Sequence, residues 1–325
     1  LDFARSGANG VDLVVTDTVS GKTITVRDQF SGSGAGVESL VVGDTTLDAT
    51  AIAERAWYRG GAGDDSFAGS DLNERFDGGA GDDVISAGAG NDVLHGGAGS
   101  DTLAGEVGSD DYYWAPGDGS DIVSDWWNEG DVDVLHLDGV DLARLDLARS
   151  GNNNADLLVT DTLTGETITV YGKFYGSGSG IESLVVGATA LDTTAIAEQA
   201  WYRGGSGDDG FWGGDLSERF DGGAGDDLLV GGAGDDVYRY ASGDGNDTID
   251  DTDGLADRLV FSDLTAADVR LLIVGDDLHV DVLGTGQTLT DVGHFTSATR
   301  GLDQITFSDG TTWSRSDIAA HAVAA

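Results

Sequence analysis

The chain has no cysteine, no methionine and few basic residues. Its 325 residues hold only 16 Lys and Arg against 59 Asp and Glu, which gives a formal net charge of −43. Without Cys, neither disulfides nor thiolate metal sites are available, so stability in an oxidising space must come from elsewhere. The absence of Met leads us to expect that the chain is a piece of a longer protein.

Charge and hydropathy exclude two classes of partner. The strong negative field opposes approach to nucleic acid or to an anionic membrane surface. No apolar run reaches the roughly 18 residues that a membrane-spanning helix requires, and the chain starts without a signal-peptide pattern. We therefore expect no nucleic acid partner and no membrane insertion. The same charge opposes compaction unless cations neutralise part of it, which links folding to metal binding.

Two stretches repeat every nine residues, from 60 to 113 and from 204 to 239. Each repeat is a glycine-rich turn followed by a short apolar strand. A disordered acidic linker is the alternative, but it would have no reason to keep an apolar residue at one phase. The eighth position is always large and apolar: Phe67, Phe76, Ile85, Leu94, Leu103, Tyr112, Phe211, Phe220, Leu229 and Tyr238. The sixth position is always acidic: Asp65, Glu74, Asp83, Asp92, Asp101, Asp110, Asp209, Glu218, Asp227 and Asp236.

This spacing has a physical interpretation. A short strand contributes one inward side chain, so the eighth-position residues form a core only if successive strands stack in parallel. The sixth-position carboxylates are then stacked too, and they repel one another unless a cation lies between them. Glycines at positions one, two and four allow a positive φ and direct carbonyl groups to the same point. Carboxylates and carbonyls without His or Cys favour a hard cation, and flexible geometry favours Ca²⁺ over Mg²⁺.

The chain is also internally duplicated. Residues 1–86 align with residues 145–230 at an offset of 144, with about 60 of the 86 positions identical. Past the repeats the offset becomes 126, since residues 117–121 match residues 243–247. The difference is 18 residues, or two nonapeptides, which indicates that two repeats form one coil.

Five segments are predicted, in this order: a β module at 1–59 that is truncated at its N-terminal side, a repeat block at 60–125, a β module at 126–203, a second block at 204–251, and a C-terminal β capping module at 252–325. Turn signals at residues 20–21, 164–165 and 284–286 predict a hairpin in each module. Short helices are predicted near the candidate caps Thr50 and Ser316. The predicted fold class is all-β, with two parallel β-rolls alternating with three small hairpin-rich modules in a continuous, elongated, solenoid-like arrangement.

The two blocks resemble the RTX, or haemolysin-type calcium-binding, repeats of proteins exported by bacterial type I secretion. Residues 78–86, 96–104 and 222–230 fit the pattern GGxGxDxUx of that family. Residues 238–249 resemble its YxFxxGDGxDTI ending, and residues 301–313 resemble the β module that flanks such repeats. The resemblance implies a parallel β-roll that binds each Ca²⁺ between repeats n and n+2 on one face, with several ions per chain.

The resemblance also implies ligand sets. Each site takes its ligands from repeats n and n+2. Repeat n contributes the carbonyls at positions two and four and its acidic side chain. Repeat n+2 contributes the carbonyls at positions one and three and its acidic side chain. In the first block the sets are Gly61, Gly63, Asp65, Gly78, Ala80 and Asp83; Gly79, Gly81, Asp83, Gly96, Ala98 and Asp101; Gly97, Gly99, Asp101, Asp118 and Asp121; and, on the other face, Gly88, Gly90, Asp92, Gly105, Val107 and Asp110. In the second block they are Gly205, Gly207, Asp209, Gly222, Ala224 and Asp227; Gly223, Gly225, Asp227, Asp244 and Asp247; and Gly231, Ala233 and Asp236.

Two repeats depart from the pattern. Leu72 and Leu216 replace the fourth-position glycine, and Glu74 and Glu218 replace Asp. We expect the sites that depend on these glutamates to be the weakest or empty, because the turn is restricted and the carboxylate lies one methylene further out.

The predicted function is a calcium-binding region that folds on Ca²⁺ after type I secretion. It would serve as a folding, secretion or spacer region of a larger extracellular or cell-surface protein, with calcium and neighbouring repeats as partners. An alternative is an adhesin or polysaccharide-binding module, whose support is an aromatic cluster: Tyr112, Tyr113, Trp114, Trp126 and Trp127. An enzyme is disfavoured, because neither HExxH nor GxSxG occurs and turns or calcium ligation explain the paired carboxylates.

Overall fold

The computed structural model describes residues 1–6, 10–31, 35–125, 130–175 and 179–325. It contains two compact units, which are described separately. Unit 1 comprises residues 1–146 and 151–193, and unit 2 comprises residues 147–150 and 194–325. Trp126 and Trp127 of the predicted aromatic cluster lie outside the described residues. Within the described ranges, no helix has the length and apolar character needed to cross a membrane.

Unit 1 begins with a small antiparallel module. Its elements are β1 (Asp2–Ser6), β2 (Asp12–Thr16), β3 (Thr23–Val26), β4 (Ser39–Val42), β5 (Thr45–Asp48) and α1 (Ala49–Ala53). The hairpin predicted at residues 20–21 is confirmed by the antiparallel pairing of β2 with β3. The predicted cap of α1 is wrong: Asp48, rather than Thr50, accepts the N–H of Ala51 at 2.8 Å. Phe3, Leu13 and Ile52 anchor a separate core beneath this module.

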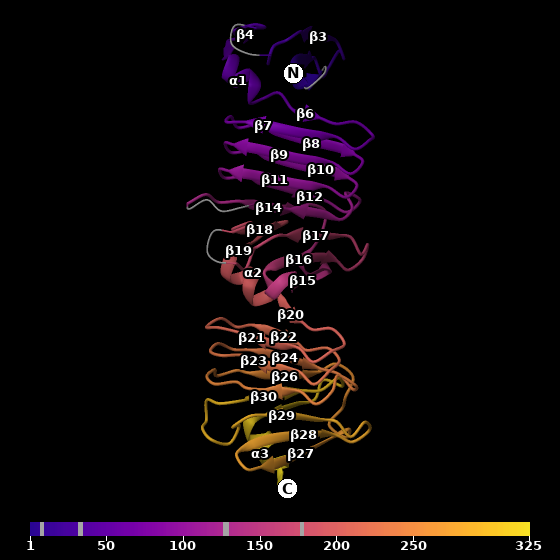
Figure 1. The fold of residues 1–325 in the computed structure, drawn as a ribbon, viewed down its shortest axis with the longest axis vertical. Coiled ribbons are helices and arrows are strands. Elements are labelled where there is room, and N and C mark those ends of the chain that lie inside the picture. The colour runs from indigo at the N-terminus through magenta and orange to yellow at the C-terminus, as the bar shows by residue number, and fades with distance from the viewer. Residues whose placement is uncertain (7–9, 32–34, 126–129, 176–178) are drawn as a thin grey trace. The chain divides into compact units, whose positions relative to one another are not determined.

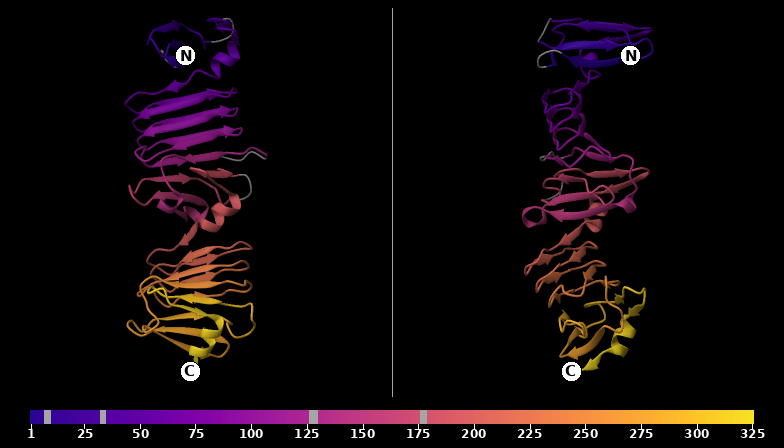
Figure 2. Two further views of the ribbon diagram at one scale, coloured as in Figure 1. Left: turned by 180° about the vertical axis from the view of Figure 1, so that it is seen from behind. Right: turned by 90° about the vertical axis from the view of Figure 1, so that its right-hand side faces the viewer.

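The first repeat block winds into a roll with two parallel sheets (Figure 1). Its strands are β6 (Tyr58–Arg59), β7 (Ser66–Ser70), β8 (Arg75–Ala80), β9 (Val84–Ala89), β10 (Val93–Ala98), β11 (Thr102–Val107), β12 (Asp111–Trp114) and β13 (Asp121–Val123). Odd-numbered strands β7 to β13 form one sheet and even-numbered strands β6 to β12 the other, and Figure 2 views the same coils from the side. Phe76 pairs with Leu94 and Leu94 with Tyr112, so two nonapeptides make one coil, as predicted.

The rest of unit 1 extends both sheets of the roll. Its elements are β14 (Val134–Leu137), the short 3₁₀ helices η2 (Leu142–Arg144) and η3 (Asn152–Asn154), β15 (Leu145–Ser150), which spans the division between the units, β16 (Asp156–Asp161), β17 (Thr167–Val170), β18 (Ser183–Val186) and β19 (Thr189–Asp192). Strand β12 pairs with β14 and β14 with β18, while β13 pairs with β17, all in parallel. The antiparallel pairing of β16 with β17 confirms the second predicted hairpin.

Unit 2 contains the second roll and the C-terminal module. Its elements are α2 (Thr193–Gln199), whose first residue belongs to unit 1, β20 (Trp201–Arg203), β21 (Gly210–Trp212), β22 (Arg219–Asp221), β23 (Leu228–Val230), β24 (Val237–Tyr240), β25 (Thr248–Ile249), β26 (Arg258–Phe261), β27 (Val269–Val274), β28 (Asp277–Val282), β29 (Thr288–Asp291), β30 (Gln304–Thr306), β31 (Thr312–Ser314), α3 (Arg315–His321) and β32 (Val323–Ala324). One parallel sheet runs β20-β22-β24-β26-β30, and the other runs β21-β23-β25-β29 and continues into the β29-β28-β27 meander. The third predicted hairpin, β28 with β29, is confirmed. The cap of α3 is Ser314 rather than Ser316.

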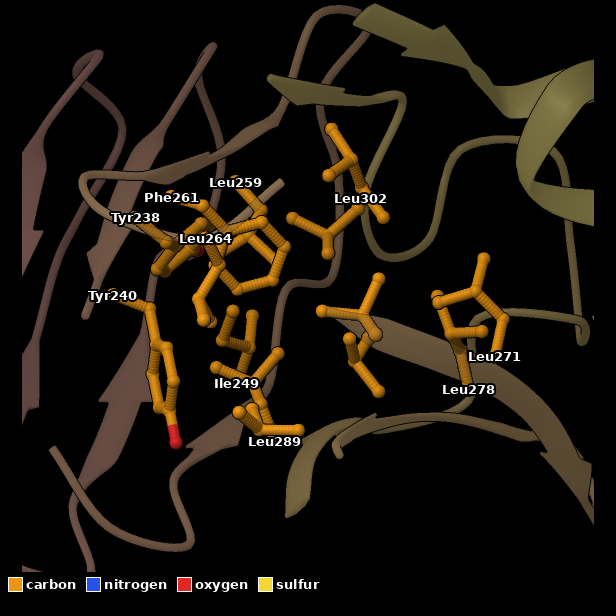
Figure 3. Packing of buried hydrophobic residues seen from close by; sticks show 14 of the residues in the cluster. Tyr238, Tyr240, Ile249, Leu259, Phe261, Leu264, Leu271, Leu278, Leu289 and Leu302 are labelled. Atoms are coloured by element: carbon orange, nitrogen blue, oxygen red, sulfur yellow. The ribbon is translucent and has the colours of Figure 1, made fainter. Parts of the chain in front are cut away.

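A single hydrophobic cluster runs through unit 2, from the roll into the C-terminal module (Figure 3). The rings of Tyr202 and Phe220 stack at 5.0 Å between centroids, and those of Phe220 and Tyr238 at 5.4 Å. Leu259 and Leu302 belong to the same cluster, and both are fully buried. A coil contributes one inward side chain per strand, so the roll depends on the module that follows to complete its core. The structure confirms the all-β prediction.

Leu228 and Leu229 test the alternation within a coil, because they are adjacent in β23 and are 37% and 1% exposed. Leu229→Ala leaves a cavity in a core one residue wide and should lower the free energy of unfolding by about 2–5 kcal/mol. Leu228→Ala should change it by no more than about 0.5 kcal/mol. Urea unfolding of both variants at saturating calcium measures the difference. Equal losses would contradict the inward orientation of the eighth position.

Candidate calcium sites

The sixth-position carboxylates form a ladder inside each roll. On one face of the first roll, Oδ1 of Asp83 accepts the backbone N–H of Asp65 at 2.7 Å, and Oδ1 of Asp101 accepts that of Asp83 at 2.7 Å. On the other face Asp92 and Asp110 act in the same way. In the second roll the acceptors are Asp227, Asp236, Asp247 and Asp257. Each carboxylate therefore holds the coil before it through one oxygen.

The second oxygen of most of these carboxylates has no partner within the part of the chain that the structure describes. Among the described residues, Oδ2 of Asp83, Asp92, Asp101, Asp110, Asp227 and Asp236 is buried without a hydrogen bond. A buried, unpartnered carboxylate oxygen is costly, because it has lost its hydration and gained nothing in return. These oxygens therefore fit the ligand role that a hard cation such as Ca²⁺ requires.

The first-position glycine allows a carboxylate oxygen and a backbone carbonyl to approach the main chain closely. A Cβ on Gly78 would lie 2.3 Å from Oδ2 of Asp83 and 2.4 Å from the carbonyl oxygen of Gly96. A Cβ on Gly60 would lie 1.8 Å from the carbonyl oxygen of Gly78 and 2.7 Å from Oδ2 of Asp65. The carboxylate of one repeat and the first-position carbonyl two repeats later thus converge above this glycine. In the second roll Asp209 and Gly222 converge above Gly204 in the same way.

The expectation that all three glycines adopt a positive φ is wrong for position one. Positions two and four do so, for example Gly79 at +102° and Gly81 at +118°. Gly78 and Gly96 do not, and their constraint is the crowding by the carboxylate described above. In the first repeat of each block even positions two and four, such as Gly61 and Gly63, lie outside the left-handed region.

Several carbonyls of the predicted ligand sets lie at the contacts between coils. Those of Gly61, Ala98, Val107 and Gly205 each accept a backbone N–H from the neighbouring coil at 2.8–2.9 Å. A carbonyl oxygen has two lone pairs, so each keeps one for a metal ion. Several other carbonyls at positions two and four face the matching glycine of the next coil, as that of Gly81 faces Gly99. The complete ligand sets remain a prediction.

The turn that closes each roll contributes two carboxylates, one that joins the ladder and one that is held within the turn. Asp121 joins the ladder, since its Oδ1 accepts the N–H of Asp101 at 2.9 Å. Asp118 is partly engaged: its Oδ2 accepts the N–H of Ala115 at 2.7 Å and lies 3.2 Å from Nε2 of His95. The hydrogen bond with Asp118 and the carboxylate of Asp77, 3.8 Å from Nδ1, raise the pKa of His95 to about 10, which favours the protonated imidazole. In the second roll Asp247 and Asp244 hold the corresponding places.

An arginine pairs with the acidic side chain at the irregular repeat of the first roll. Nη2 of Arg5 lies 3.0 Å from Oε1 of Glu74, and both side chains are buried. The guanidinium also lies 4.1 Å from the ring centroid of Tyr58, whose hydroxyl donates to Glu74. In unit 2, Arg149 lies 4.2 Å from the ring of Tyr202, beside Glu218. A guanidinium already supplies the positive charge there, which gives the expectation of weak or empty glutamate sites a physical basis.

The fifth-position side chains form a second, exposed ladder that the sequence analysis missed. Position five follows the glycine-rich turn, and from the sequence we expect Asp82 and Asp226 there to be nearly free surface charges, whereas the structure gives both a hydrogen-bond partner. Oδ1 of Asp82 accepts the N–H of Ser100 at 2.9 Å, and Oδ1 of Asp226 accepts that of Asn246 at 2.8 Å. The fifth position thus stabilises the turn from outside, while the sixth faces the buried space.

Burial raises the pKa of the inner carboxylates, and neighbouring carboxylates raise it further. The pKa is about 7 for Asp92 and Asp121 and about 8 for Asp133 and Asp236. Backbone N–H groups oppose the shift but do not cancel it. Without a cation, these side chains favour protonation at neutral pH.

Four buried carboxylates near the ends of the rolls were not predicted: Asp125, Asp133, Asp251 and Asp257. The signal for two of them was present, since Asp125 and Asp251 match at the offset of 126 and each follows the ladder residue of its closing turn by four positions. Asp133 and Asp257 break that offset by two residues, so no constant spacing reveals them.

Comparison with known proteins identifies the repeats. The RTX calcium-binding nonapeptide repeat, in four copies, matches residues 68–103, 77–112 and 212–249. The haemolysin-type calcium binding protein related domain matches residues 277–317. No curated protein matches the chain. The crystal structure of extracellular lipase LipA from Serratia marcescens is similar at 18% identity and a TM-score of 0.25, over 73% of this chain and 37% of that chain.

Asp226 and Asp227 test the register of the repeat. Asp227→Asn removes a charge from two predicted sites and should raise the calcium midpoint of folding by roughly tenfold or more, because lost binding energy is lost folding energy. Asp226→Asn keeps the acceptor for Asn246 and should shift the midpoint less than about twofold. Calcium titration followed by circular dichroism compares the two. A larger effect at Asp226 would show that the assigned register is wrong.

The raised pKa values predict an inverted pH response without metal. A carboxylate whose pKa is raised by folding stabilises the fold below its unfolded value near 4, and this stability is lost as pH rises through about 6–8. In excess chelator, β signal should therefore increase as pH falls from 8 to 5. The affinity of the folded chain for calcium should fall over the same interval, because protons compete with the ion for the same carboxylates. Calorimetry should also detect proton release on calcium binding, and identical metal-free spectra at both pH values would contradict the assignment.

Proposed function

Because segments of this chain are RTX calcium-binding nonapeptide repeats, we propose that it is a calcium-dependent folding region of a larger exported protein. It would bind several Ca²⁺ ions between successive coils. The observation that carries this proposal is the row of buried carboxylate oxygens without partners, most of which lie against the first-position glycine of their own repeat.

The charge of the chain and the burial of its carboxylates favour folding that is coupled to calcium binding. The net charge of −43 and the desolvated ladders both oppose the compact state until cations neutralise them. Extracellular modules with such oxygen ligands bind calcium at about 10⁻⁴–10⁻³ M. Sites of this strength are empty where free calcium is scarce and fill outside the cell. The chain would pass a type I secretion channel unfolded and fold at the cell surface or in the medium, where it would act as a folding or spacer region.

The alternative, an adhesin or polysaccharide-binding module, has less support from the structure than from the sequence. Tyr112 and Trp114 are buried, so their rings are core rather than a platform for a sugar. Tyr113 stacks on His136 with 4.5 Å between ring centroids. The matched repeats bind calcium as structural elements, which likewise provides no support for a catalytic role.

The proposal predicts that the chain is switched by calcium. In excess chelator at pH 7.5 or thereabouts, circular dichroism should show mostly disorder in the repeat blocks, and millimolar Ca²⁺ should restore β signal. Mg²⁺ at the same concentration should substitute poorly, because it requires near-octahedral geometry and retains its water. A spectrum unchanged by chelation, or equal recovery with Mg²⁺, would count against the proposed function.

A further inference from the structure

Three carboxylates meet at the end of the second roll. Asp236, Asp251 and Asp257 are each fully buried, and one ligand oxygen of each lies within 4.8 Å of the other two. Asp236 precedes β24, Asp251 follows β25, and Asp257 precedes β26. The cluster therefore joins the last nonapeptide, the closing turn and the first strand of the C-terminal module.

Each of these carboxylates is anchored by one oxygen and unpartnered at the other. Oδ1 of Asp236 accepts the N–H of Glu218 at 2.7 Å, and Oδ1 of Asp257 accepts that of Asp236 at 2.9 Å. Oδ2 of Asp251 accepts the hydroxyl of Tyr238 at 2.7 Å. The remaining oxygens, Oδ2 of Asp236, Oδ1 of Asp251 and Oδ2 of Asp257, are buried without a partner among the described residues.

Two glycines allow the carboxylates to approach the backbone closely. A Cβ on Gly231 would clash with the hydroxyl of Tyr238 and would lie 2.3 Å from the unpartnered Oδ2 of Asp236 and 3.0 Å from Oδ2 of Asp251. A Cβ on Gly254 would lie 2.3 Å from Oδ2 of Asp257 and 2.4 Å from the carbonyl oxygen of Gly234. A backbone carbonyl thus adds to the carboxylates, and every donor is a hard oxygen.

The first roll ends in the same arrangement. Asp110, Asp125 and Asp133 are buried, and their ligand oxygens also lie within 4.8 Å of one another. The hydroxyl of Tyr112 donates to Asp125, as that of Tyr238 does to Asp251. The chain therefore builds this cluster twice, at corresponding places in two separate units.

We propose that each three-carboxylate cluster is a calcium site in which the last sixth-position Asp of a roll acts with two carboxylates from beyond the nonapeptides, and that it fastens the end of the roll to the module that follows. The proposal rests on the proposed function for the identity of the ion. Three buried carboxylates bring more ligand charge than the two of a nonapeptide site, and affinity for Ca²⁺ rises with ligand charge and rigidity. These two sites should fill at lower calcium than the nonapeptide sites.

The test counts ions on the full chain. Equilibrium dialysis against Ca²⁺ gives the number bound, and circular dichroism of the same samples gives the folded fraction. Asp251→Asn should bind one ion fewer than the wild type and lose part of the tightest class, Asp125→Asn should do the same, and the double variant should bind two fewer. Asp253→Asn is the matched control, because it removes the same charge from an exposed position in the same segment and should keep the wild-type count.

A second variant separates ligation from structure. Tyr238→Phe removes the hydrogen bond to Asp251 but no ligand, so it should fold and bind the full number of ions even if Asp251→Asn fails to fold. Equal loss in Tyr238→Phe and Asp251→Asn would overturn the proposal, and so would an unchanged ion count in folded Asp251→Asn and Asp125→Asn. If instead the wild-type chain binds no calcium, the proposed function itself fails.

Discussion

Repulsion between stacked carboxylates is the constraint on which both rolls depend. The sixth-position side chains recur at each coil, and their backbone bonds hold one oxygen in place while leaving the other buried and unpartnered. Burial and mutual repulsion raise the pKa of Asp92 and Asp236 well above the usual range, which measures how unfavourable the anions are without a counter-charge. The glycine at position one of most repeats matters for the same reason, because a Cβ there would clash with that oxygen, as at Gly78 and Gly231.

The modules that flank the rolls complete the hydrophobic core and the hydrogen-bonded ladders of the rolls. One inward side chain per strand gives a core one residue wide, so the hydrophobic cluster of unit 2 continues from Phe220 through Leu259 to Ile305. The ladders continue as well: the N–H of Asp133 bonds Glu182, and that of Asp257 bonds Asp303. Flanking modules thus satisfy both the apolar and the polar ends of each stack.

The buried carboxylates at the two ends of a roll have different sources of counter-charge. At the start of the first roll, the guanidinium of Arg5 neutralises Glu74 from within the chain, and stacking on Tyr58 holds it there. At the far end no arginine pairs with Asp110, Asp125 or Asp133 among the residues that the structure describes, and the proposed metal ion takes that role. The internal cation thus supplies counter-charge to one acidic side chain at the start of the roll, whereas at the far end the proposal assigns that role to calcium.

The sequence by itself determined the features that follow from a repeat. The phase of the eighth and sixth positions predicts parallel coils of two nonapeptides and a stack of carboxylates, because period alone fixes which side chains point inward. The hairpins followed from turn chemistry in the same way. Tertiary structure alone decided the pairing of Arg5 with Glu74, which lie 69 positions apart, and the meeting of Asp236, Asp251 and Asp257. These contacts join residues that do not share one position of the nine-residue repeat. How closely the residues approach depends on how a module packs on a roll. No spacing within the sequence predicts that packing.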